Sequence, residues 1–272
     1  MMHRVIYLVA FTLLFVACKE EEKETSWTYS ETIGLKAINP IGLTSTDEGI
    51  WLSDGDRNRL VLVDGDGKVV SAVDSLDRPM HIASQDNKIY VPTYGNDQVL
   101  KIENGLAEQI AIADSLDAPA GVDIHGKEMA IADFYNHRVL YSDNGEGYIS
   151  IGQQGKKDGQ FYYPTDVQIT DDEIWVADAY NNRVQIFDKS GNFKKIIGAD
   201  AKMNAATGIF VTETEVMVTD FESERVLVFD HDGNLKQELR QGVTKPTDVI
   251  ILNGDLYIAN YRNGSLVVYK RT

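Results

Sequence analysis

The chain has 272 residues, of which 43% are apolar and 25% are charged, a composition that is ordinary for a folded protein and excludes disorder over the whole length. Its 42 acidic and 26 basic residues give a formal net charge of -16, which argues against a protein that binds the phosphate backbone of nucleic acids. A single cysteine excludes an internal disulfide framework and any zinc site built from several thiolates.

The first segment, residues 1–17, has the pattern of a signal peptide. Its apolar run over residues 5–17 has about 13 residues, which is too short for the roughly 20 that span a membrane. The run ends in Phe-Val-Ala-Cys, which resembles the lipobox of bacterial lipoproteins, although phenylalanine stands where leucine is usual. The resemblance implies that Cys18 is lipidated after cleavage; a buried structural cysteine is the alternative.

Residues 18–26 continue as a short charged run, which we expect to be a solvated acidic tether between the lipidated Cys18 and a folded domain. A lysine followed by acidic residues directly after such a cysteine resembles the surface-export signal of Bacteroidetes lipoproteins, and a plain spacer is the alternative. The two resemblances together imply a lipoprotein of the cell outer membrane, which the export signal would place at the cell surface.

The rest of the chain, residues 27–272, contains one unit six times. Equivalent positions lie 39 to 45 residues apart, at Asp54, Thr93, Asp133, Asp178, Asp220 and Asn260. Each unit alternates short strand patterns of period two with turn residues, and no helical periodicity occurs. Four-stranded units of about 40 residues that repeat in this way predict an all-β fold, a six-bladed β-propeller with antiparallel blades.

The two ends of the repeat region are complementary. The sixth unit stops after its third strand, and the extended segment 27–34 has the pattern of a fourth strand without a unit of its own. We therefore expect residues 27–34 to pair with residues 266–269, which closes the ring and removes an exposed sheet edge. The six units leave no room for a second domain.

The units resemble NHL repeats. The resemblance rests on Ala-Asp-Ala-Tyr-Asn-Asn-Arg-Val-Gln-Ile-Phe-Asp at residues 177–188, on the related segment 132–140 and on the glycine-containing loop at 151–161. It covers nearly all of residues 27–272, with departures at the aspartate and arginine positions of two units, namely Thr93, Gln98, Asn260 and Ser265. It implies the propeller fold and specifies no activity, because one fold hosts many activities.

Strand order predicts which loops share a face of the propeller. The loops before each first strand and those between each second and third strand meet at one rim. Its outer part gathers aromatic and cationic side chains, which are Arg57, Tyr94, Tyr135, His137, Tyr180, Phe221, Tyr261 and Arg262. Aromatic rings beside polar groups suit a glycan, a peptide or a partner protein, and the alternative is that the rings only cover loop backbone.

Nearer the axis, the same rim is predicted to carry His81, Asp166 and Asp248. An imidazole and two carboxylates could hold a divalent cation such as Ca²⁺, and the alternative is that the aspartates bond nearby backbone N–H groups. Some similar propellers are enzymes: peptidylamidoglycolate lyases hold zinc on three histidines, and gluconolactonase-like enzymes hold a cation on acids and amides. Only His137 joins His81 on this rim, so we expect no three-histidine zinc site.

Two functional hypotheses follow from these patterns. The first is a lipid-anchored, monomeric recognition or scaffold protein of the cell envelope that binds a glycan, peptide or protein partner and no nucleic acid. It rests on the regular repeat and on the lack of a complete catalytic constellation in the sequence. The second is a metal-assisted lyase or hydrolase with its site at the axis, built on the three residues named above.

Overall fold

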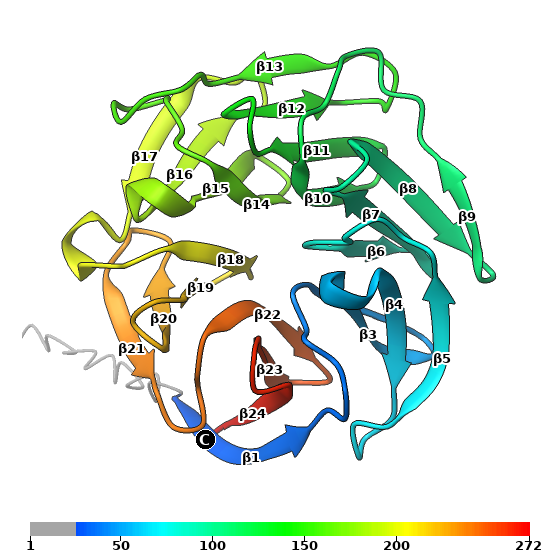
Figure 1. The fold of residues 1–272 in the computed structure, drawn as a ribbon. Helices are drawn as coiled ribbons and strands as arrows, with labels where there is room; N and C mark the ends of the chain where they lie inside the picture. Colours follow the sequence, from blue (N-terminus) through cyan, green and yellow to red (C-terminus); the bar gives the residue numbers. More distant parts are fainter. Residues whose placement is uncertain (1–25) are drawn as a thin grey trace, which may run out of the picture.

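The computed structural model describes residues 26–272, which form a ring of six four-stranded antiparallel sheets around a central axis (Figure 1). The predicted all-β six-bladed propeller is therefore confirmed. The predicted signal peptide, the lipidation site Cys18 and the tether up to residue 25 lie outside the described residues. Within residues 26–272, no helix is long and apolar enough to cross a membrane.

The first three blades follow one another along the chain, each with its strands in sequence order from the axis outwards. Blade 1 contains β2 (Leu43–Thr46), β3 (Gly49–Asp54), β4 (Arg59–Val63) and β5 (Val69–Asp74). Blade 2 contains β6 (Ala83–Gln85), β7 (Lys88–Thr93), β8 (Gln98–Glu103) and β9 (Leu106–Gln109). Blade 3 contains β10 (Pro119–His125), β11 (Glu128–Asp133), β12 (Arg138–Ser142) and β13 (Ile149–Ile151).

The next two blades repeat this order. Blade 4 contains β14 (Pro164–Ile169), β15 (Glu173–Asp178), β16 (Arg183–Asp188) and β17 (Phe193–Ile197). Blade 5 contains β18 (Ala206–Val211), β19 (Glu215–Asp220), β20 (Arg225–Asp230) and β21 (Leu235–Leu239). Short 3₁₀ turns lie between strands or blades, as η1 (Gly55–Arg57), η2 (Ala179–Asn181) and η3 (Ala199–Ala201).

Blade 6 is assembled from both ends of the chain. It contains β22 (Pro246–Leu252), β23 (Asp255–Asn260), β24 (Ser265–Arg271) and, as its outer strand, β1 (Trp27–Gly34). β1 is antiparallel to β24 in a register that pairs Trp27 with Arg271 and Gly34 with Ser265. The predicted closure by residues 27–34 is therefore confirmed.

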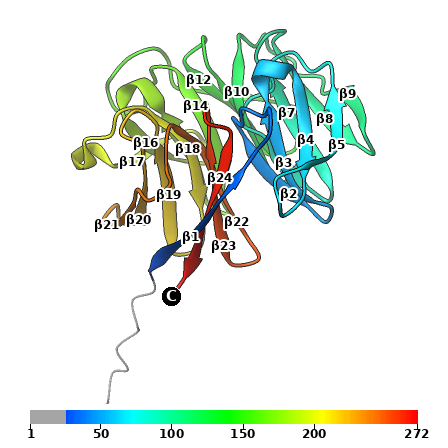
Figure 2. The same cartoon turned by 60° about the horizontal axis from the view of Figure 1, so that its bottom comes forward.

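The strand directions define two faces. We call the face with the loops between second and third strands the upper rim, and the opposite face the lower face. Because β24 starts at the upper rim and ends with Arg271 at the lower face, its partner Trp27 also lies at the lower face (Figure 2). The described chain therefore enters the propeller from the side opposite the upper rim.

The hydrophobic core lies between successive blades. One cluster joins Trp175 and Ile186 of blade 4 to Val218, Leu227 and Phe229 of blade 5, and all of these side chains are buried. Each blade has two apolar faces, because successive side chains of a strand point to opposite sides of the sheet. Both faces are buried only when a neighbouring blade packs on each side. The repeat thus fixes the ring, and the ring fixes where the axial residues meet.

Candidate functional site

Glycine and polar residues alternate around the axis, at the position just before or within each inner strand. In blade order these residues are Gly42, His81, Gly121, Asp166, Gly208 and Asp248. Each glycine lies against the backbone of the polar residue in the next blade, so that a Cβ atom on Gly121 would lie 2.7 Å from the Thr165 carbonyl oxygen. The glycines therefore let the inner strands approach closely enough for the three polar side chains to meet.

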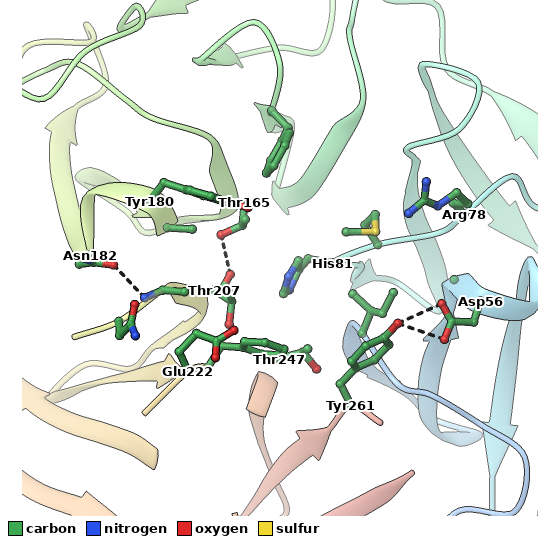
Figure 3. Close-up of a pocket in the computed structure, with 18 residues that line it drawn as sticks. Asp56, Arg78, His81, Thr165, Tyr180, Asn182, Thr207, Glu222, Thr247 and Tyr261 are labelled. Carbon is green, nitrogen blue, oxygen red and sulfur yellow. Dashed lines mark hydrogen bonds between the residues drawn. The ribbon is translucent and has the colours of Figure 1, made fainter. Parts of the chain in front are cut away.

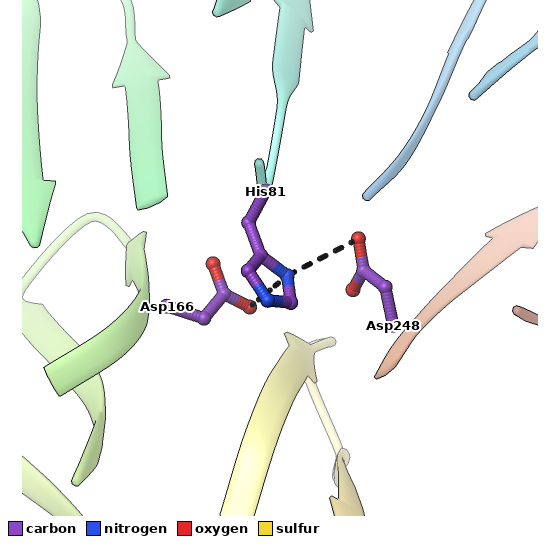
Figure 4. Close-up of side chains that lie close together, drawn as sticks. All are labelled: His81, Asp166 and Asp248. Atoms are coloured by element: carbon purple, nitrogen blue, oxygen red, sulfur yellow. Dashed lines mark ion pairs between the residues drawn. The ribbon is translucent and has the colours of Figure 1, made fainter. Parts of the chain in front are cut away.

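The three polar side chains form a buried group on the axis, drawn in Figure 4. His81 Nδ1 lies 3.7 Å from Asp248 Oδ2 and 4.0 Å from Asp166 Oδ2. One ligand atom from each residue lies within 4.8 Å of the others, so the group could hold a metal ion. The predicted proximity of these residues at the axis is what the structure shows.

The two aspartates also bond backbone N–H groups of the next blade. Asp166 Oδ2 accepts a hydrogen bond from the Ile209 N–H at 2.8 Å, and Asp248 Oδ2 accepts one from the Leu43 N–H at 2.7 Å. Their other oxygens accept from the N–H groups of the following residues, Val167 and Val249. The backbone-bonding role predicted as the alternative is therefore present, and it fixes the carboxylates in place.

His81 differs from the aspartates because its Nδ1 atom is buried and has no hydrogen-bond partner among the described residues. Burial by itself lowers the pKa of His81, but Asp166 and Asp248 more than offset this, and the pKa lies above its ordinary value. Burial also raises the pKa of Asp166 above its ordinary value, with Asp248 adding to the shift and His81 opposing it. The group therefore attracts a positive charge, either a proton or a metal ion.

A cavity of about 520 Å³ opens above His81 on the upper rim, and we call it the upper funnel (Figure 3). Its lining combines aromatic rings, threonines and charged groups, among them Phe134, Tyr180, Phe221, Tyr261, Thr165, Thr207, Thr247, Asp56, Arg78 and Glu222. His81 lies at the centre, with Arg78 and Asp56 on one side and Glu222 on the other. This is the size and mixed character of a pocket for a small organic ligand.

Of the rim residues predicted from the sequence, Tyr180, Phe221 and Tyr261 line the upper funnel. Tyr94 and Tyr135 lie beside it, with ring centroids 5.8 Å apart, in an aromatic cluster that also contains Phe134. The Tyr261 hydroxyl donates a hydrogen bond to the Asp56 carboxylate, with the hydroxyl oxygen 3.0 Å from both carboxylate oxygens. This bond fixes the Tyr261 ring in the lining of the funnel.

The other three predicted rim residues do not line the funnel. Arg57 forms an ion pair with Asp54 at 3.4 Å, and Arg262 is exposed beyond the lining residues. His137 is buried, stacks on Tyr162 with ring centroids 5.4 Å apart, and accepts a hydrogen bond at Nδ1 from the Tyr163 N–H. Burial lowers the pKa of His137, in keeping with a neutral ring that supports the loop.

Sequence reasoning missed Arg78, which lines the funnel from the turn before blade 2. Its backbone has a φ of 54°, and its carbonyl oxygen accepts a hydrogen bond from the Tyr94 N–H at 3.0 Å. Its guanidinium lies 4.8 Å from the centre of the Tyr94 ring. The signal was available, because Arg78 directly precedes the repeated proline of blade 2 and therefore belongs to the same turn that carries the axial residues.

A second cavity, of about 240 Å³, lies on the axis below the polar group, and we call it the lower cavity. Asp166 and Asp248 line it, together with Asp123 of blade 3, whose carboxylate accepts a hydrogen bond from the Ile169 N–H at 2.7 Å. The three-residue group therefore separates two cavities, with His81 lining the upper one and the two aspartates lining the lower one. Asp123 was not singled out from the sequence.

The comparisons with known proteins agree with the architecture. Residues 161–187 match the model of the NHL repeat. No curated protein matches the chain.

Solved structures show the same fold at low identity. A streptogramin B lyase is 13% identical, covers 91% of this chain and 98% of its own, and has a TM-score of 0.65. A virginiamycin B lyase from Staphylococcus aureus is 12% identical over 91% of this chain and 99% of its own, also with a TM-score of 0.65. A protein of unknown function from Bacteroides thetaiotaomicron is 13% identical over 92% and 77% of the two chains, with a TM-score of 0.71. Taken with the repeat match, these likenesses identify the chain as a six-bladed β-propeller that carries an NHL repeat.

Proposed function

We propose that this protein is a recognition protein of the cell envelope that binds a carboxylate-bearing peptide in the upper funnel. The main support for this proposal is Arg78, which lines an aromatic funnel and forms no ion pair within residues 26–272. A guanidinium held over a ring and pointing into a cavity suits a carboxylate, which it binds through paired hydrogen bonds. Phe134, Tyr180 and Phe221 supply apolar surface for side chains of the peptide.

The orientation of the chain supports a role at a membrane surface. Trp27, the first strand residue, lies at the lower face, while the upper funnel opens at the opposite rim. A lipid on Cys18 would attach the tether on the side of the lower face, so that the funnel would face away from the membrane. The excess of acidic over basic residues in the chain would add repulsion between the domain and anionic headgroups. Outer-membrane anchoring through Cys18 is part of this proposal, as is a monomeric state.

Binding of short peptides to the full chain tests the ligand class. We expect peptides with a free C-terminal carboxylate to bind better than the same peptides with an amidated end. Arg78→Gln should weaken binding of the free-acid peptides about 10-fold to 100-fold, because a charged hydrogen-bonded pair is lost. Arg262→Gln, on the same rim but outside the funnel lining, is the matched control. Equal binding of both peptide forms, or binding of glycans alone, would contradict the proposal.

A second candidate function is a metal-assisted lyase or hydrolase at the axis. It is favoured by His81, which lines the funnel floor and has two carboxylates behind it. Three similar solved structures are lyases, each 12 or 13% identical to this chain. One of them is a catalytically inactive virginiamycin B lyase in which alanine replaces one histidine. Turnover of a lactone or of a hydroxyglycine peptide that needs added metal and is lost in His81→Ala would establish this function over the first.

A further inference from the structure

In the axial group, the two aspartates have hydrogen-bond partners, whereas the Nδ1 atom of His81 has none among the described residues. Asp166 and Asp248 are buried, and each is fixed by backbone N–H groups rather than by a cation. His81 is 4% exposed, and its Nδ1 atom faces both carboxylates without forming a hydrogen bond to either. A buried polar atom without a partner is costly, so its presence in a closely packed site requires an explanation.

The geometry of the group suits a metal ion better than direct pairing. The distances of 3.7 and 4.0 Å from Nδ1 to the carboxylate oxygens are too long for hydrogen bonds. Atoms that lie within 4.8 Å of one another can share one ion at about 2.4–2.5 Å from each, and a shift of a few tenths of an ångström would bring them to the roughly 2.0–2.2 Å of zinc bonds. Backbone N–H groups hold both carboxylates in position, as outer-shell partners do at metal sites.

The donor set indicates the class of ion. Ca²⁺ prefers six to eight oxygen ligands, whereas this group offers one imidazole nitrogen and two carboxylates. One nitrogen and two oxygens suit a divalent transition-metal ion, and affinity for such ions is higher for Zn²⁺ than for Mn²⁺. Two carboxylates would neutralise the charge of a divalent ion when His81 is neutral. The lower cavity, which Asp166 and Asp248 line, provides a route by which an ion could reach the group.

We propose that His81, Asp166 and Asp248 bind one divalent transition-metal ion on the propeller axis, with Zn²⁺ preferred over Ca²⁺. The ion would join the inner edges of blades 2, 4 and 6, and three protein ligands would leave room for water in its coordination shell. This inference does not depend on the peptide ligand proposed for the upper funnel.

Metal analysis of the full chain, produced without a histidine tag, tests the site. After treatment with EDTA and dialysis, we expect the protein to take up one Zn²⁺ per chain and to melt at a higher temperature with Zn²⁺ than with Ca²⁺. His81→Ala should lower the Zn²⁺ affinity about 100-fold or more, since it removes one of three ligands. The matched control is His125→Ala, because His125 pairs with Asp171 away from the axis, at a distance of 2.9 Å.

We replace His81 rather than either aspartate, because all four carboxylate oxygens of Asp166 and Asp248 accept hydrogen bonds from backbone N–H groups. Asn in place of Asp166 or Asp248 would turn an NH₂ group toward a backbone N–H, so these variants risk misfolding for reasons unrelated to metal. If His81→Ala also misfolds, X-ray absorption of the zinc-loaded wild-type protein decides, and one nitrogen with carboxylate oxygens is the expected shell. Failure to retain Zn²⁺ or Mn²⁺, binding of Ca²⁺ alone, or unchanged Zn²⁺ affinity in a folded His81→Ala would overturn the proposal. Peptide binding by the same samples reports separately on the upper funnel.

Discussion

In four blades, a buried aspartate ends the second strand. It connects the turn before the first strand with the turn that leads to the third strand. Asp178 Oδ1 accepts a hydrogen bond from the Tyr162 N–H at 2.8 Å, while Oδ2 accepts from Arg183 Nε at 2.9 Å. The same aspartate–arginine pair recurs within three other blades, at Asp54–Arg59, Asp133–Arg138 and Asp220–Arg225. A group that recurs with the same partners in four blades has a structural role, which distinguishes these aspartates from Asp166 and Asp248.

We expect Asp178→Ala to lower the free energy of unfolding by about 3–5 kcal/mol, because it leaves the largely buried Arg183 guanidinium without its carboxylate. Urea unfolding followed by circular dichroism measures the change. Asp66→Ala, which removes an exposed partner of Lys68, should leave the free energy of unfolding close to its wild-type value, because solvent screens this pair. Equal losses in the two variants would contradict the structural role assigned to Asp178.

The buried carboxyl group of Asp123 predicts that the stability of the protein changes with pH. Burial raises its pKa to about 7, whereas the unfolded chain has an ordinary aspartate pKa of about 4. The folded state therefore favours the protonated form, and the stability that this form contributes is lost as the pH rises from about 4 to 7. Asp123→Asn keeps an acceptor for the Ile169 N–H and removes the titration.

With EDTA present, wild-type protein should lose up to about 4 kcal/mol of stability relative to Asp123→Asn between pH 4 and pH 8. Urea unfolding at a series of pH values measures the difference. Parallel stability profiles for the two proteins would show that the Asp123 carboxylate is not held in its protonated form.

At the scale of the strands, the inner edges of the blades are spaced by glycine. A side chain on Gly121 would meet the Thr165 carbonyl oxygen at 2.7 Å and the Asp166 Cα atom at 2.8 Å. Both neighbours are backbone atoms of β14, which cannot move without shifting the strand. The glycines at this position therefore control how closely adjacent inner strands approach.

Gly121→Ala should destabilise the protein by about 1–3 kcal/mol or more, because the added methyl group pushes two inner strands apart. Thermal melting measures the loss. Gly147→Ala is the matched control, since a Cβ atom there meets nothing within 4 Å. A Gly121→Ala protein that melts like Gly147→Ala would show that the inner strands are not limited by this contact.

At the scale of the whole molecule, the ring is closed by strands from opposite ends of the chain. β1 covers the outer edge of β24, and Trp27 fills the core between blades 5 and 6, where it is 3% exposed. The Arg271 guanidinium lies 4.6 Å from the centre of the Trp27 ring, which secures the last residues of the chain. Closure pairs the outer edge of β24, so that blade 6 has four strands like the other five blades.

Trp27→Ala should cost about 3–5 kcal/mol, because a large buried aromatic side chain is removed from an inter-blade core. We expect the variant to aggregate more readily at elevated temperature, since the loosened β1 exposes the edge of β24. Light scattering during thermal melting measures both effects. Glu31→Ala changes an exposed residue of the same strand and should leave both quantities near their wild-type values.

The amino-acid sequence determined the number of blades, the strands of each and the closure by residues 27–34, because all of these follow from a local pattern repeated six times. It also placed His81, Asp166 and Asp248 near the axis, because equivalent positions of a closed ring share one radius. These predictions needed only periodicity and strand direction.

Only the tertiary structure decided how the side chains at those positions interact. The separation of His81 from the carboxylates, the unpartnered Nδ1 atom and the two cavities depend on how closely blades 2, 4 and 6 approach through their glycine neighbours. The same holds for Arg78, because the repeat assigns it only to a turn, whereas its contact with Tyr94 and its place in the funnel follow from packing. Repeats specify backbone positions, whereas contacts between blades arise from packing across the ring and are not encoded in any single repeat.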